Sequence, residues 1–123
     1  MIGRVLCISA VSLAVVTAAH AATPKANLKV TYWQHGRAQA ATVWTLRCNP
    51  IGGTHPARAA SCATLSKHAA DLKPATRACT LMPTTTSAQA HIVGTWAGRH
   101  VDRMYRIGCP GWTDLRLVLT GRT

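Results

Sequence analysis

The chain is short and strongly basic, with 123 residues, 14 Lys and Arg, three acidic side chains and a formal net charge of +11. With only three aspartates and no glutamate, the sequence offers no paired carboxylates for general acid–base catalysis. The positive charge favours anionic partners, such as nucleic acid or an anionic envelope surface. However, no tight run of basic residues indicates a dedicated nucleic-acid site.

The first 21 residues have the pattern of a secretory signal peptide. A short positive region ends at Arg4, and an almost unbroken apolar run follows over residues 5–18. Residues 19–21 form the Ala-x-Ala pattern that signal peptidase recognises. The apolar run is shorter than the roughly 20 residues of a membrane-spanning helix. We therefore expect a secreted protein, extracellular or periplasmic, in which residues 22–123 form a single domain.

An even number of cysteines follows this leader, because Cys7 is removed with it. In a secreted chain an even number is typical of disulfides, and each bridge contributes about 2–4 kcal/mol by restricting the unfolded chain. Counting alone leaves all three pairings open. The four cysteines are Cys48, Cys62, Cys79 and Cys109.

A metal site and an enzyme active site are both disfavoured. The candidate zinc ligands are Cys48, Cys62, His55 and His68, but they show no Cys-x-x-Cys or His-x-x-x-His spacing. A secretory route also oxidises thiols. The sequence has no Gly-x-Ser-x-Gly elbow and no glycine-rich phosphate loop. We therefore expect no metal, no cofactor and no enzyme activity.

Two antiparallel strands are predicted at the start of the mature chain. Residues 28–32 and 42–47 alternate or cluster β-branched and aromatic side chains, and residues 34–37 between them resemble a turn.

A helix is predicted next, over residues 56–65, which are rich in helix-forming side chains. Thr54 or His55 can cap it, and Pro56 suits its first turn. A second, short helical turn is expected over residues 68–72 and should end before Pro74, since proline disfavours helix in the residue before it.

Three further strands are predicted from apolar stretches at residues 91–96, 101–107 and 115–120. Residues 97–100 are expected to form the hairpin turn between the first two, with Gly98 able to take a positive φ. The predicted order is β-β-α-β-β-β.

Two segments resemble the Streptomyces subtilisin inhibitor family. Residues 45–56, TLRCNPIGGTHP, are followed by CATL at residues 62–65. In that family a strand ends in Cys, and a Pro, a Gly-Thr-His-Pro turn and a helical Cys follow in this order. A second similarity begins with GTWAG at residues 94–98 and continues through Val101 and DRMY to Cys109.

The resemblance implies an α+β fold, with a five-stranded antiparallel sheet, two short helices and two disulfides. The family's pairing implies that Cys48 bonds to Cys62 and Cys79 to Cys109. It also implies a homodimer formed through the sheet.

The resemblance implies a function as well, that of a serine protease inhibitor with a substrate-like loop. The reactive bond would join Leu81 to Met82, flanked by the contact residues Cys79, Thr80 and Pro83. An apolar Leu81 suits a subtilisin-like or chymotrypsin-like protease as partner.

Three differences from the family motivate an alternative. The family usually has Tyr-Asp-Pro soon after the reactive bond, whereas Pro83-Thr84-Thr85-Thr86-Ser87 follows it here; Thr80 replaces a proline, and Ile107 replaces an asparagine. Pro83 lacks the backbone N–H that a substrate-like segment normally offers to a protease. The alternative is a cationic cell-envelope binding protein on the same scaffold without inhibitory activity.

Overall fold

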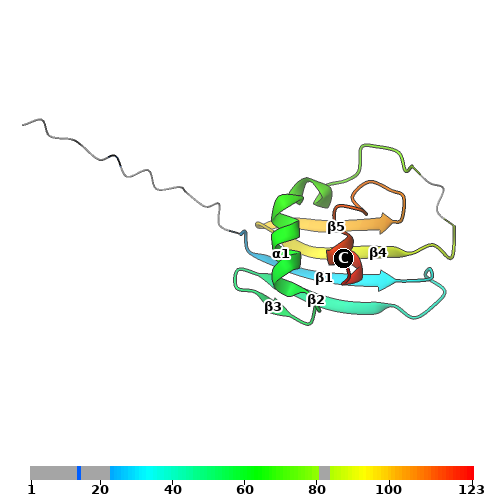
Figure 1. Cartoon of the computed structure of the whole chain (residues 1–123), viewed down its shortest axis with the longest axis horizontal. Helices are drawn as coiled ribbons and strands as arrows, with labels where there is room; N and C mark the ends of the chain where they lie inside the picture. Colours follow the sequence, from blue (N-terminus) through cyan, green and yellow to red (C-terminus); the bar gives the residue numbers. More distant parts are fainter. Residues whose placement is uncertain (1–13, 15–22, 81–83) are drawn as a thin grey trace, which may run out of the picture.

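The computed structural model describes Ala14, residues 23–80 and residues 84–123. A single antiparallel sheet organises this part of the chain, with the strand order β3-β2-β1-β4-β5 (Figure 1). The expected five-stranded antiparallel sheet is therefore confirmed. Its strands are β1 (Ala26–Trp33), β2 (Thr42–Cys48), β3 (Gly52–Gly53), β4 (Gln89–Trp96) and β5 (Arg99–Arg106).

The fifth strand is not the one predicted from the sequence. Residues 115–120 were expected to be a strand, but they contain helix α2 (Arg116–Thr120), and the two-residue β3 completes the sheet. Leu115, Val118 and Leu119 are fully buried, and their spacing of three and four residues places them on one helical face. A short apolar run cannot separate a buried strand from a buried helix by periodicity alone.

Helix α1 (Arg58–Lys67) begins two residues later than predicted, and the short 3-10 helix η1 (Ala69–Leu72) follows as expected. The N-cap of α1 is Ala57 and not Thr54 or His55, although the ring of His55 accepts a hydrogen bond from the amide of Ala57 at 3.0 Å. The hydroxyl of Thr54 instead accepts a bond from the amide of Thr45 at 3.0 Å.

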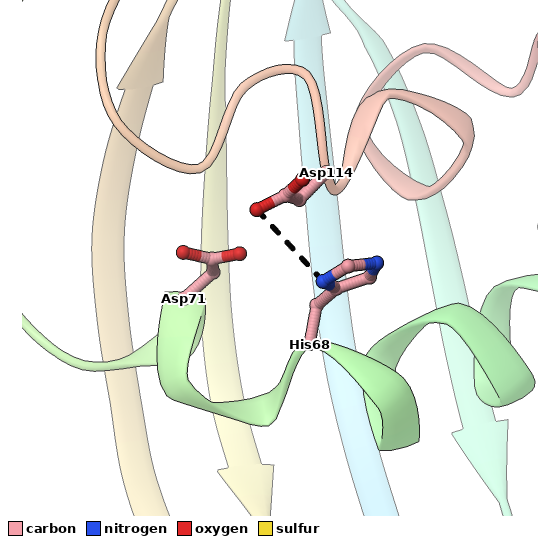
Figure 2. Close-up of side chains that lie close together, drawn as sticks. All are labelled: His68, Asp71 and Asp114. Carbon is pink, nitrogen blue, oxygen red and sulfur yellow. Dashed lines mark ion pairs between the residues drawn. The ribbon is translucent and has the colours of Figure 1, made fainter.

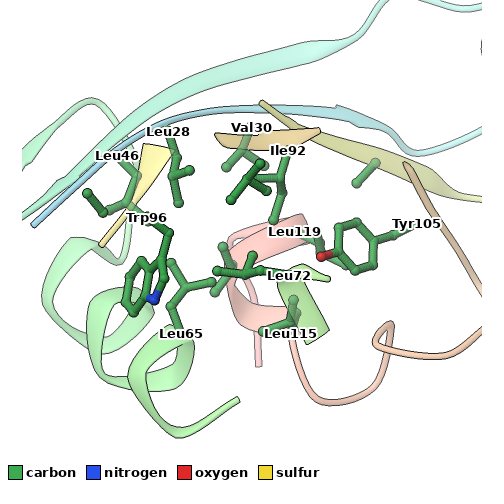
Figure 3. Packing of buried hydrophobic residues seen from close by; sticks show 14 of the residues in the cluster. Leu28, Val30, Leu46, Leu65, Leu72, Ile92, Trp96, Tyr105, Leu115 and Leu119 are labelled. Atoms are coloured by element: carbon green, nitrogen blue, oxygen red, sulfur yellow. The ribbon is translucent and has the colours of Figure 1, made fainter. Parts of the chain in front are cut away.

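Both helices pack on the same face of the sheet, where the core lies (Figure 3). Leu28 and Val30 of β1 point toward them, and Leu65 of α1 and Leu119 of α2 point back. Burying each such side chain contributes roughly 1.5–3 kcal/mol. Because side chains alternate along a strand, the intervening residues lie on the opposite face, which no element of the described ranges covers.

Both expected disulfides are present. Cys48 at the end of β2 bonds to Cys62 of α1, and Cys79 bonds to Cys109. The first bridge ties the sheet to the helical layer. The second ties the chain before β4 to the chain after β5.

The predicted hairpin between β4 and β5 is also confirmed. Ala97 and Gly98 connect the strands with φ values of 51° and 77°. Two central residues with positive φ are typical of a tight turn that matches the twist of the strands. Within the described ranges, none of the helices has the length and apolar character required to cross a bilayer.

Candidate reactive loop and its supports

The long connection between η1 and β4 contains the residues that the resemblance selected. Leu81, Met82 and Pro83 lie outside the described residues. The segment before them, residues 73–80, is exposed at every position. Cys79 and Thr80 are at its end, and both are bonded to the loop that follows β5.

Thr80 is anchored by two hydrogen bonds in addition to the neighbouring disulfide. Its amide donates to the carbonyl of Gly108 at 2.6 Å, and its hydroxyl donates to the same carbonyl at 2.8 Å. Gly108 directly precedes Cys109, the partner of Cys79. The backbone at Thr80 is therefore fixed to the loop after β5 by one covalent bond and two hydrogen bonds.

A compact turn follows on the other side, at Thr84–Ser87. The Ser87 amide donates to the Thr84 carbonyl at 3.2 Å, and the Thr84 amide donates to the Ser87 hydroxyl oxygen at 2.9 Å. The connection between β1 and β2 packs against this turn at Gly36. A Cβ at Gly36 would lie 2.0 Å from the carbonyl oxygen of Thr85, so only glycine fits there.

Ile107, at the position where the family has asparagine, is 42% exposed. Its amide donates to the carbonyl of Ala88 at 3.2 Å. The backbone at Ile107 therefore links the end of β5 to the chain just before β4, whereas its side chain faces solvent.

Three titratable side chains meet where η1 approaches the loop before α2 (Figure 2). Nδ1 of His68 lies 3.8 Å from Oδ2 of Asp114, and one side-chain atom of Asp71 lies within 4.8 Å of both. Burial, and then the hydrogen-bonded carboxyl group of Asp114, raise the pKa of Asp71 above its usual value. The cluster joins η1 to the C-terminal loop.

Sequence reasoning did not find this cluster, and its statement that the sequence offers no paired carboxylates is wrong for Asp71 and Asp114. It considered His68 together with cysteines, but Cys48 and Cys62 are bonded to each other. Two of the three acidic residues of the chain converge here, although 43 positions separate residues 71 and 114, and no local spacing in the sequence signals such a contact.

His55 is buried, and both of its ring nitrogens are engaged. Nε2–H donates to the carbonyl of Val118 at 2.8 Å, while Nδ1 accepts from the amide of Ala57 at 3.0 Å and the hydroxyl of Ser61 at 3.3 Å. Burial lowers the pKa of His55. These contacts join the Gly-Thr-His-Pro turn to both α1 and α2.

Comparison with known proteins gives a family match over most of the chain. The sequence profile described as subtilisin inhibitor-like matches residues 9–107. Subtilisin inhibitor-like protein 1 of Streptomyces cacaoi is 39% identical over 67 residues, which are 47% of this chain and 57% of that relative. The match thus spans little more than half the length of the relative.

Among solved structures, the chain is similar to Streptomyces caespitosus sermetstatin, determined in complex with Bacillus licheniformis subtilisin. The TM-score is 0.47 and the sequence identity 22%, over 77% of this chain and 91% of that chain.

The profile match includes the Gly-Thr-His-Pro turn, the disulfide between Cys48 and Cys62, and the hairpin of β4 and β5. It therefore contains the first segment on which the resemblance was based and the second segment as far as residue 107, two residues before Cys109. The chain belongs to the subtilisin inhibitor-like family.

Proposed function

We propose that this protein inhibits a serine protease by offering the Leu81–Met82 bond in a substrate-like loop. The observation that carries the proposal is the anchoring of Thr80. Thr80, which directly precedes Leu81, is held by the disulfide between the neighbouring Cys79 and Cys109 and by two hydrogen bonds to Gly108.

Anchoring favours inhibition because it reduces the entropy that a loop loses on binding. A segment that is already fixed loses less freedom in the complex, so more of the contact energy contributes to affinity. Anchoring also opposes release after cleavage. If Thr80 and the Thr84–Ser87 turn both stay in place, the new amine remains close to the acyl group at high effective concentration, and the bond can re-form.

The proposed target is a subtilisin-like or chymotrypsin-like protease. Leu81 in the specificity pocket would suit an apolar pocket and would be a poor match for an acidic one. Cys79, Thr80 and Pro83 are the proposed neighbouring contacts. Since Pro83 has no N–H, it could not donate a backbone hydrogen bond to the protease from that position.

We also propose that residues 1–21 direct secretion and that residues 22–123 act outside the cytoplasm. Two disulfides in one small domain are typical of oxidising compartments. Mass spectrometry of protein recovered from outside the cell should give an N-terminus at Ala22. A chain that retains residues 1–21 would refute the predicted cleavage.

A titration with active-site-calibrated subtilisin and chymotrypsin tests the inhibitor proposal. Stoichiometric inhibition is expected, and Leu81→Gly should weaken it by about 100-fold or more, since a central anchor side chain dominates such interfaces. Ile51→Gly is the matched control, because Ile51 is a 55% exposed apolar residue in the turn between β2 and β3. Micromolar protein without effect on either protease would refute the proposal.

The homodimer is a further proposal, with the uncovered face of the sheet as the contact. Val43 of β2 lies on this face and is 50% exposed. Sedimentation equilibrium should show twice the monomer mass, and Val43→Lys should shift the equilibrium toward monomer. A monomer at all concentrations would refute the dimer.

The alternative function, binding to an anionic envelope surface, is favoured by the net charge of +11. Lys29, Arg47 and Arg106 are exposed on the uncovered face of the sheet. Binding to anionic vesicles that is lost at high salt, without protease inhibition, would support this function in place of the first.

A further inference from the structure

We propose that Arg103 is a positioning residue for the reactive loop. Its guanidinium group binds the segment that precedes Cys79 and the segment that follows Cys109, and the disulfide joins the same two segments. This inference rests on the proposed inhibitory function. Its observations all lie within the described residues, on β5, η1 and the two segments that the disulfide joins.

The guanidinium group of Arg103 donates to three carbonyl oxygens in two separate segments. Nη1 donates to the carbonyl of Asp71, at the end of η1, and to that of Lys73 at 2.8 Å. Nη2 donates to the carbonyl of Pro110 at 2.7 Å. Lys73 begins the exposed segment that leads to Thr80, and Pro110 directly follows Cys109.

Tyr105, two residues along the same strand, reinforces this contact. Its hydroxyl donates to the carbonyl of Asp71 at 2.6 Å, and its ring lies 4.6 Å from the guanidinium carbon of Arg103. Tyr105 is 1% exposed, so it is a fixed support for the arginine. The carbonyls at the end of a helix lack hydrogen-bond donors within the helix. Here the side chains of Arg103 and Tyr105 donate to the carbonyl of Asp71.

The geometry matters because Arg103 and the disulfide connect the same two segments at different points. Attachment at residues 79 and 80 alone would leave residues 73–78 free to rotate about that one point. The second link, from Lys73 through Arg103 to Pro110, opposes that rotation. After cleavage of the proposed reactive bond, the segment that ends at residue 81 would remain held at both points.

A glycine in the loop after β5 leaves space for the guanidinium group of Arg103. Gly111 has a φ of 88°, and a Cβ there would lie 3.0 Å from Cε1 of Tyr105 and 3.2 Å from Nη2 of Arg103. Lysine could not replace the arginine, because one ammonium group cannot form a planar fork that reaches three carbonyls.

The test compares Arg103→Met and Arg103→Lys with the unaltered protein. We expect Arg103→Met to raise the inhibition constant toward subtilisin by about tenfold or more and to accelerate cleavage of the inhibitor by a similar factor. Arg103→Lys should lie between the two. In the free protein, amide hydrogen exchange at Thr80 should also become faster in the Arg103→Met variant.

Leu46→Ala is the control for a general loss of stability. Leu46 is fully buried on β2, which β1 and β4 separate from β5 in the sheet. At a temperature where all variants are folded, this control should keep the inhibition constant, the cleavage rate and the Thr80 exchange rate of the unaltered protein within about twofold.

Two results would overturn the inference. One is an Arg103→Met variant that inhibits and resists cleavage as the unaltered protein does. The other is unchanged exchange at Thr80, which is decisive even if the unaltered protein inhibits no protease. If Arg103→Met does not fold, Arg103→Lys provides the same two readouts.

Discussion

Thr80 directs both its amide and its hydroxyl at a single carbonyl, that of Gly108, at 2.6 and 2.8 Å. Gly108 is next to Cys109, so the two hydrogen bonds and the disulfide attach residues 79 and 80 to residues 108 and 109. In the proposed mechanism this stretch immediately precedes the bond that the protease attacks. Its rigidity would therefore determine how closely the loop imitates a substrate.

Replacement of Thr80 by valine should weaken inhibition while leaving the fold intact. Valine retains the branched shape and the amide bond but loses the hydroxyl bond, which is worth about 0.5–1.5 kcal/mol. The inhibition constant should therefore rise by about twofold to tenfold, as measured by steady-state inhibition of subtilisin. Thr95→Val on β4 is the control, since Thr95 is exposed and far from Gly108 in the chain. An unchanged inhibition constant for Thr80→Val would show that the hydroxyl bond does not stabilise the loop.

The two disulfides should differ in what their removal affects. Removing the bridge between Cys48 and Cys62 should lower the free energy of unfolding by about 2–4 kcal/mol, because it ties β2 to α1 in the core. Inhibition by the folded fraction should persist. Removing the bridge between Cys79 and Cys109 should instead convert the protein into a substrate that is cleaved and released.

Alanine pairs at each bridge, followed by urea denaturation and by gel analysis of inhibitor incubated with subtilisin, check this contrast. Equal cleavage of the two variants at a temperature where both are folded would contradict it. Such a result would mean that the bridge nearer the loop has no specific effect on the loop.

The sequence predicted some elements well because their signals are local. The strand pattern of residues 42–47 and the turn signal at Gly98 depend only on neighbouring residues. Residues 115–120 were misread because five or six apolar-rich residues fit a buried strand and a buried helix equally well. The edge strand β3 has only two residues, both glycine, and therefore leaves no side-chain pattern to detect.

The supports of the loop could not be predicted for a different reason. Arg103 reaches the carbonyl of Asp71 across 32 positions, and His68 reaches Asp114 across 46. Every residue has a backbone carbonyl, so the type of the accepting residue does not indicate such a contact in the sequence. Only the register of β5 beside β4 and the path of the loop after it bring these groups together.

A change of specificity should follow from Leu81→Lys. A lysine in that position suits the acidic floor of a trypsin-like pocket and would be poorly accommodated in an apolar one. Inhibition of trypsin should appear, and inhibition of chymotrypsin should fall by about 100-fold. Met82→Lys is the matched control and should not produce trypsin inhibition at the same level. Trypsin inhibition by Met82→Lys alone would place the reactive bond one residue later.

The stability of the protein should fall as the pH drops below about 6.5, because of His55. Burial lowers the pKa of His55 in the folded protein, whereas in the unfolded chain the imidazole has its ordinary pKa. As the pH falls through the ordinary value, the unfolded chain binds the proton first, so protonation favours unfolding. The stability associated with neutral His55 is thus fully present above that value and is lost as the pH falls through the lower pKa of the folded state.

The hydrogen bonds of His55 also oppose protonation of its Nδ1 atom in the folded protein. Nδ1 already accepts from Ala57 and Ser61, so a proton there would leave both donors without their acceptor.

Urea denaturation between pH 7.5 and 5 should therefore show a decline in the free energy of unfolding that His55→Gln abolishes. The exposed His35, in the connection between β1 and β2, serves as the control, and His35→Gln should keep the decline. The raised pKa of Asp71 acts in the opposite sense, because the folded protein binds that proton more tightly than the unfolded chain and is stabilised as the carboxyl group is protonated. An unaltered decline in His55→Gln would assign the acid sensitivity to another group.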